Sequence, residues 1–139
     1  MVRFAIVVGL AVISNGQTSS SPFSSELDAC MKIARTQLDM LKCASEEAGR
    51  SKAEAATIVD QLLPKAVASG TPGASIAIQE SERIWKSYSD AFLIAMYPAA
   101  DKQAAYGSTF ATNHDLELAR LNWEHVAALR RLQQHYTAK

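Results

Sequence analysis

The chain has 139 residues, of which 48% are hydrophobic, and its 14 basic and 14 acidic side chains give a formal net charge of 0. This balance argues against nucleic acid and against anionic membrane surfaces as partners, because both favour basic patches. A chain of this length fits one domain and can bury an adequate hydrophobic core.

The N-terminal stretch MVRFAIVVGLAVISNG has the pattern of a secretory signal peptide. Arg3 provides a positive start, residues 4–13 form an uncharged apolar run, and Ser14 and Gly16 are small residues at the −3 and −1 positions of a cleavage site. The apolar run is too short to span a membrane. The sequence therefore predicts an exported protein that keeps no membrane anchor after cleavage.

This interpretation divides the chain into three parts. We expect a signal peptide over residues 1–16, a flexible serine-rich lead-in over 17–25 and a single helical domain over 26–139. Removing the signal peptide leaves 123 residues with 13 basic and 14 acidic side chains, so the mature protein stays close to neutral.

The distribution of glycine and proline predicts where helices begin and end. In the expected helical domain these residues fall mainly in two stretches, 64–73 and 98–107, and the segments between are rich in strong helix formers. No stretch alternates polar and apolar residues in the way that indicates a strand. We expect helices over residues 25–35, 37–63, 74–97 and 110–136, which make an all-α bundle of three to four helices.

The two cysteines, Cys30 and Cys43, can form a disulfide only if the chain brings their Cα atoms close together. On one continuous helix they would lie about 20 Å apart, whereas bridged Cα atoms lie roughly 4.4–6.8 Å apart. Thr36 and Asp39 resemble a capping box, so a helix is expected to begin there and the chain to turn back before it. In an exported protein we predict a disulfide, worth roughly 3 kcal/mol; two unrelated buried thiols are the alternative.

Aromatic side chains occur at helical spacing in the later segments. Trp85 and Tyr88 share a helical face in segment 74–97, and Trp123 lies on a ridge of segment 110–136. Such stripes are typical of a hydrophobic core, so all three are predicted to be core residues. Asp90 lies beside the first stripe and is expected to cap a helix or pair with an arginine of the last helix.

Motifs for catalysis and for metal binding are missing from the sequence. It has no nucleophile elbow, HExxH, phosphate-binding loop or dinucleotide fingerprint. His114 and Glu117 are three residues apart on an expected helix, but two ligands are too few for a zinc site. We predict no catalytic residues, no metal and no cofactor.

Two motifs carry a resemblance to a known family. The stretch CMKIARTQLDMLKCA, residues 30–44, resembles the first motif of the LprI-type lysozyme inhibitor family, approximately C…A.TQ.EMN.CA. WKSYSDA, residues 85–91, is similar to the W..YRDA motif of that family. The matching positions of the first motif are Cys30, Ala34, Thr36, Gln37, Met40, Cys43 and Ala44, with Asp39 in place of Glu.

The resemblance implies a periplasmic or secreted bacterial protein that binds a protein partner, with lysozyme or a related wall hydrolase expected. An inhibitor needs a pre-ordered loop with a polar or basic tip to occlude an acidic cleft. We expect residues 99–109 to form this loop, with Lys102 facing carboxylates, Tyr106 as an anchor and Ser108 hydrogen-bonding; a plain interhelical connection is the alternative.

Two other functions remain open from the residues alone. The aromatic helix face could line a pocket for a small molecule or a metal in the periplasm. The protein could also be a non-catalytic subunit that docks onto a larger envelope complex.

Overall fold

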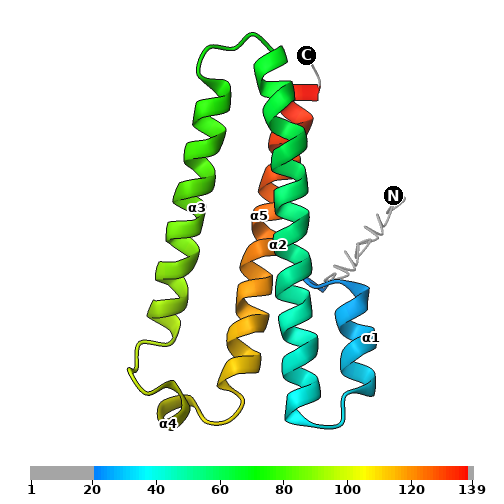
Figure 1. The fold of residues 1–139 in the computed structure, drawn as a ribbon, viewed down its shortest axis with the longest axis vertical. Helices are drawn as coiled ribbons and strands as arrows, with labels where there is room; N and C mark the ends of the chain where they lie inside the picture. The colour runs from blue at the N-terminus through cyan, green and yellow to red at the C-terminus, as the bar shows by residue number, and fades with distance from the viewer. Residues whose placement is uncertain (1–20, 138–139) are drawn as a thin grey trace, which may run out of the picture.

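The structure, a computed structural model, describes residues 21–137 and shows five α-helices within them (Figure 1). They are α1 (Ser25–Ile33), α2 (Gln37–Ala68), α3 (Ala74–Met96), α4 (Lys102–Tyr106) and α5 (Phe110–Thr137). The prediction of an all-α fold is confirmed. The expected signal peptide 1–16 and the beginning of the expected lead-in, 17–20, lie outside the described residues. Between residues 21 and 137 no helix combines the length and the apolar character that a membrane span requires.

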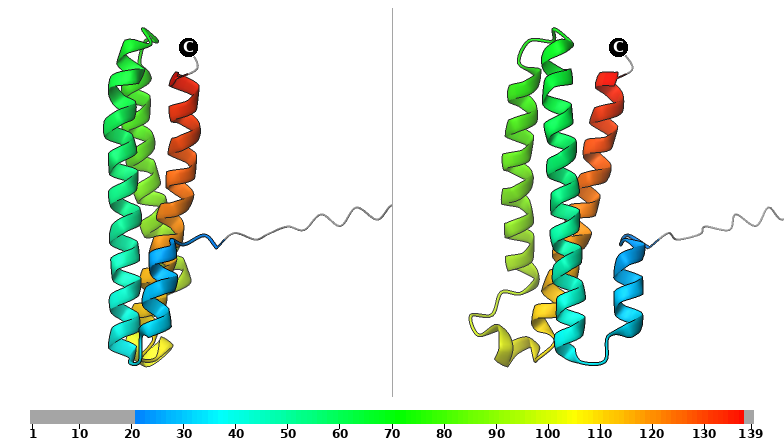
Figure 2. Two further views of the ribbon diagram at one scale, coloured as in Figure 1. Left: turned by 90° about the vertical axis from the view of Figure 1, so that its right-hand side faces the viewer. Right: turned by 45° about the vertical axis from the view of Figure 1, so that its right-hand side comes forward.

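Three long helices make the body of the molecule (Figures 1 and 2). α2 and α5 run in the same direction and lie side by side, while α3 runs back in the opposite direction beside them. The short helix α1 folds back along the first part of α2. The turn between α1 and α2 and the connection from α3 to α5 through α4 therefore lie at the same end of the bundle.

Small residues let α2 and α5 approach closely. The buried face of α2 begins with Ala44, Ala48, Ser51 and Ala55, which recur at intervals of three and four residues and so fall on one side of the helix. On α5, Ala119 is completely buried. Close contact between helix backbones is possible where such short side chains meet.

Polar side chains on α2 and α5 fix the register between the two helices along their edges. The Arg130 guanidinium donates a hydrogen bond to Glu54 over 2.9 Å, and the Gln133 amide donates to Gln61 over 3.0 Å.

The main hydrophobic core lies toward the α2–α3 turn and includes residues from all three long helices. Its buried members are Ala55, Ile58, Leu62, Ala66, Ala74, Ile78, Val126 and Leu129. Trp123 is partly buried and packs against this cluster. α3 therefore contributes buried residues to the core mainly through its first turns.

The predicted helix ends are close to those observed, with two differences. Helix α2 was expected to end before Pro64 but continues through it to Ala68. A proline inside a helix removes one backbone hydrogen bond, yet Leu62 and Ala66 are both 0% exposed, so burial of this last turn keeps it helical. The five-residue helix α4 was not expected; Asp101 caps it by accepting a hydrogen bond from the amide of Ala104.

Candidate functional site

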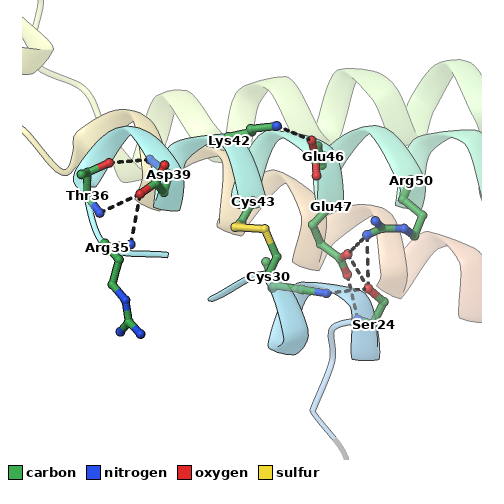
Figure 3. The surroundings of a disulfide bond; sticks show 11 residues. Ser24, Cys30, Arg35, Thr36, Asp39, Lys42, Cys43, Glu46, Glu47 and Arg50 are labelled. Atoms are coloured by element: carbon green, nitrogen blue, oxygen red, sulfur yellow. Dashed lines mark hydrogen bonds and ion pairs between the residues drawn. A yellow bond between two sulfur atoms is a disulfide. The ribbon is translucent and has the colours of Figure 1, made fainter. Parts of the chain in front are cut away.

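One end of the bundle holds most of the features predicted from the sequence. We call it the disulfide end: the α1–α2 turn (34–36), the first turns of α2, and the connection 97–109 that contains α4 (Figure 1). The Cys30–Cys43 disulfide crosses from α1 to α2 there, with Cα atoms 5.7 Å apart (Figure 3). The predicted bridge is confirmed, and it is possible because the chain reverses direction between the two cysteines.

The reversal depends on the predicted capping box. The Thr36 hydroxyl accepts a hydrogen bond from the Asp39 amide over 3.1 Å, and the Asp39 carboxylate accepts one from the Thr36 amide over 2.9 Å. The Arg35 amide donates to the same carboxylate over 3.1 Å (Figure 3). These hydrogen bonds, that from Arg35 first, lower the pKa of Asp39. The turn is therefore ordered by three hydrogen bonds in addition to the disulfide.

A buried carboxylate, Glu47, forms the second anchor of α1 and was not singled out from the sequence. It accepts hydrogen bonds from the Ser24 amide over 2.7 Å, the Ser24 hydroxyl over 2.5 Å and the Trp123 indole over 2.8 Å, and it pairs with Arg50. Burial by itself raises the pKa of Glu47, but these hydrogen bonds and the Arg50 charge outweigh burial and lower it. Glu47 thus joins the cap of α1 to both α2 and α5.

The connection 97–109 is more tightly held than a free tip would be. The Lys102 ammonium donates a hydrogen bond to the Tyr97 carbonyl oxygen, and its side chain is half-buried. The Tyr106 hydroxyl accepts from the Ala99 amide over 3.1 Å, and its ring packs against Tyr97 and Phe110 with centroids 5.3 and 5.8 Å away. Lys102 and Tyr106 therefore both take part in holding the connection itself together.

Ser108 is the exposed member of the three predicted contact residues. Its hydroxyl accepts a hydrogen bond from the Gln37 side-chain amide over 3.0 Å. This bond joins the connection 97–109 to the first residue of α2, so the two halves of the disulfide end form one surface.

Exposed side chains in the α1–α2 turn and on the helix residues next to it give this surface its chemical character. Ile33 and Leu38 are each 74% exposed and Met40 is 41% exposed. The Arg35 side chain points away from the helices (Figure 3), and its guanidinium makes no hydrogen bond or ion pair with the residues from 21 to 137. The turn and the helix residues next to it therefore present apolar groups around an available cation.

The aromatic face of α3 differs from the prediction at two positions. Tyr88 is 50% exposed, so its assignment to the core is wrong: its ring lies against the neighbouring rings of Trp85 and Phe92 on the same helix. Asp90 is also exposed, and it pairs with Lys86 over 2.7 Å rather than with an arginine of the last helix. An exposed lysine one turn away is the nearer partner for this carboxylate.

The two tryptophans occupy different environments. Trp123 packs on the main core and donates to Glu47, whereas Trp85 is half-buried and stacks on His125 of α5 with ring centroids 4.6 Å apart. His125 in turn bonds Glu82 of α3 over 2.9 Å. α3 is thus tied to α5 by a stacked ring pair and a hydrogen bond that the sequence did not reveal.

His114 and Glu117 do not form a shared site. The His114 ring lies 3.2 Å from Asp115, while Glu117 binds the Arg120 guanidinium. Within the part of the chain that the structure describes, no group of three or more His, Cys, Asp or Glu side chains is arranged to hold a metal ion.

Taken together, these features define a small disulfide-linked helical protein with a structured, exposed end suited to contact with another protein. A scan against family models matches residues 30–135 to the lysozyme inhibitor LprI family. This match covers most of the chain, and the protein therefore belongs to the LprI family of lysozyme inhibitors. No curated protein and no solved structure matched the sequence.

Proposed function

We propose that the protein is exported by a bacterium and inhibits lysozyme, or a related cell-wall hydrolase, by placing its disulfide end in the catalytic cleft. Membership of a lysozyme inhibitor family supports this class of partner. Lysozyme acts through two carboxyl groups that flank the scissile bond, so its cleft is acidic. A complementary inhibitor needs a positive group on a surface that is already ordered.

The observation that carries the proposal is the position of Arg35. Its guanidinium extends from the α1–α2 turn and has no partner among the described residues, while its backbone amide is fixed by Asp39 (Figure 3). The backbone that presents the cation is therefore rigid and only its side chain must be ordered on binding. Guanidinium groups suit this role because they bind carboxylates with two parallel hydrogen bonds.

Apolar surface next to the cation supplies further contact area. A recess of about 240 Å³ lies between α1 and α2 beside the disulfide, with Ile33 and Lys42 in its walls. Leu38 is exposed at the start of α2. Interfaces gain most of their affinity from a few large side chains that become fully buried, and Ile33 and Leu38 are suited to that role.

The connection 97–109 completes the proposed surface. Ser108 is exposed and adds a polar group beside Gln37. We propose that Lys102 and Tyr106 act mainly by keeping this connection in shape, because the ammonium of one and the hydroxyl of the other already bond backbone groups of the connection. The positive charge of Lys102 makes the local electrostatic potential more positive, but its ammonium is not the group that enters the cleft.

A wall-lysis assay with the purified mature chain tests this proposal. We expect the wild type to slow lysis by lysozyme and Arg35→Glu to weaken inhibition at least tenfold, which corresponds to about 1.4 kcal/mol. Arg131→Glu is the matched control, because Arg131 is exposed on the last turns of α5 and makes no ion pair with the residues from 21 to 137. Both variants should keep the helicity and melting temperature of the wild type.

The assay separates the function from its proposed site. No inhibition by the wild type of any lysozyme in a panel of animal, bacterial and phage enzymes would refute the inhibitor function. Equal inhibition by Arg35→Glu and the wild type would retain the function and reject the disulfide end as its site. Lys102→Glu is expected to reduce inhibition less than Arg35→Glu, with a lower melting temperature.

A further inference from the structure

A second candidate site lies away from the disulfide end, in a pocket between α2, α3 and α5. The pocket has a volume of about 360 Å³, within the range of small-molecule sites. Ala55 and Ala56 of α2, Leu118 of α5 and the Trp85 indole form much of its wall. None of the residues proposed to contact lysozyme lines it, so it is independent of the proposed inhibition.

Two residues that line the pocket, Trp85 and Ser89, each have a polar atom without a hydrogen-bond partner among residues 21–137. The Trp85 indole nitrogen and the Ser89 hydroxyl are buried and form no hydrogen bond with any residue in the described range, 21–137. Ser89 is only 6% exposed, and its position one helical turn after Trp85 places both groups on the same side of α3. Buried polar groups are almost always hydrogen-bonded. An indole N–H can only donate, so its missing partner is an acceptor, and the nearby hydroxyl can donate to the same acceptor.

The Trp85 ring is held in place for such a contact. It stacks on the His125 ring at an interplanar angle of 16°, and His125 is fixed by its 2.9 Å bond to the Glu82 carboxylate. Because an ionised carboxylate is an acceptor, the imidazole nitrogen is the donor in this bond. The indole N–H is therefore oriented before any ligand arrives.

One unpaired cation beside the pocket suits an anionic acceptor. Two acids line it, but Glu82 is engaged by His125, and Asp90 pairs with Lys86 over 2.7 Å. Lys52 lines the pocket from α2, and its ammonium makes no hydrogen bond or ion pair with residues 21–137. Lys52 is therefore the charged side chain of this lining that has no ion-pair or hydrogen-bond partner among residues 21–137.

We propose that this pocket binds a small monocarboxylate with an apolar body. The carboxylate oxygens accept hydrogen bonds from the Trp85 indole and the Ser89 hydroxyl and pair with the Lys52 ammonium. The apolar body lies against the alanine and leucine wall. Such a ligand satisfies both buried donors and the free cation at once, and it bridges the three long helices.

The two tryptophans allow a direct test by NMR, in which the indole N–H resonances of the mature chain are followed during titration. The probes are butyrate, octanoate and 4-phenylbutyrate, with 4-phenylbutyramide as the uncharged match of the last. We expect at least one carboxylate to shift the Trp85 resonance at millimolar concentration and the amide to bind at least tenfold more weakly. The Trp123 resonance should stay in place, because that indole already donates to Glu47.

Variants identify the contacts. Ser89→Ala and Lys52→Gln should each weaken binding of the carboxylate about tenfold, while Lys65→Gln, which removes a charge near the other end of α2, should leave it unchanged. The proposal is overturned if none of the three carboxylates shifts the Trp85 resonance up to its solubility limit. It is also overturned if the amide binds as well as the acid, or if neither Ser89→Ala nor Lys52→Gln alters the affinity.

Discussion

At the scale of single residues, Glu47 connects more of the fold than any other charged side chain described here. It is 0% exposed. Its oxygens accept hydrogen bonds from Ser24, which caps α1, from the Arg50 guanidinium of α2 and from the Trp123 indole of α5. A buried carboxylate is tolerated only when hydrogen bonds and a counter-charge replace its water shell. Here Ser24, Trp123 and Arg50 provide that replacement, and the carboxylate holds three helices together.

Removing this carboxylate should be strongly destabilising. We expect Glu47→Ala to lower the free energy of unfolding by about 3 kcal/mol, because it leaves the Trp123 and Ser24 donors without an acceptor. Urea unfolding followed by circular dichroism measures this change. Glu46→Ala is the control: Glu46 is exposed and lies 3.9 Å from Lys42, so its loss should change stability by less than about 0.5 kcal/mol. Similar values for the two variants would contradict the anchoring role of Glu47.

The same residue gives the stability a defined pH dependence. The folded state lowers the pKa of Glu47 from its ordinary value of 4.5, so below that pH the unfolded chain binds more protons than the folded one. The contribution of Glu47 is therefore fully present above about pH 4.5 and is lost as the pH falls through the lowered pKa. Glu47→Gln should lose less stability than the wild type between about pH 5 and pH 3.

Urea midpoints measured across that range test the sign of the effect. Some acid dependence should remain in Glu47→Gln, because hydrogen bonds also lower the pKa values of Asp39 and Glu80. An identical pH profile for wild type and variant would show that Glu47 does not titrate differently in the folded and unfolded chains.

At the scale of helices, α1 is a short helix that is attached to α2 at both of its ends. The disulfide holds its last turn and Ser24 holds its first, while Leu27 is the only residue of α1 that is buried. A nine-residue helix is not stable by itself in water. The disulfide, the Ser24 hydrogen bonds and the burial of Leu27 therefore determine whether α1 forms.

Removing the bridge should therefore weaken the protein without unfolding the long helices. We expect the double variant Cys30→Ala, Cys43→Ala to lose about 3 kcal/mol of unfolding free energy, the contribution of closing a short loop. Most helicity should remain, because the main core lies in α2, α3 and α5. Non-reduced mass spectrometry of the wild type should find no free thiol. Two thiols open to alkylation, or loss of all helicity in the variant, would contradict this description.

The sequence predicted those features of the helices that depend on residues close together in the chain. Helix ends and the capping box at Thr36 were predictable because glycine, proline and capping residues act within a few positions. The continuation of α2 past Pro64 was not, because it depends on the burial of Leu62 and Ala66 against other helices. Tertiary burial here overrides a local helix breaker.

The same limit applies to the candidate site. The cysteine pair could be predicted because both residues lie within one short hairpin, 13 positions apart. Glu47 could not, because it meets Ser24 and Trp123, which lie 23 and 76 positions away. Lys102 was expected to face carboxylates of the partner, and only the folded connection shows that its ammonium bonds the Tyr97 carbonyl. Long-range partners decide which surface charges remain available.

At the scale of the whole molecule, the balance of charge limits how the protein could find the acidic partner proposed above. The formal net charge is 0, so the chain has no strong overall field to accelerate encounter with a charged enzyme. In the proposed complex, attraction would come from the few groups at the disulfide end, above all from Arg35. Close contacts of this kind mainly change the dissociation rate, whereas long-range steering mainly changes the association rate.

The salt dependence of inhibition tests this view of the whole molecule. Raising the ionic strength from about 0.05 to 0.5 M shortens the Debye length from about 14 to 4 Å and removes long-range steering. We expect the wild type to lose no more than about threefold in inhibition over this range, since only close contacts contribute. Arg35→Glu should stay weaker than the wild type at both salt concentrations. A loss of a hundredfold or more for the wild type would show that the whole surface, and not the disulfide end alone, guides the protein to its target.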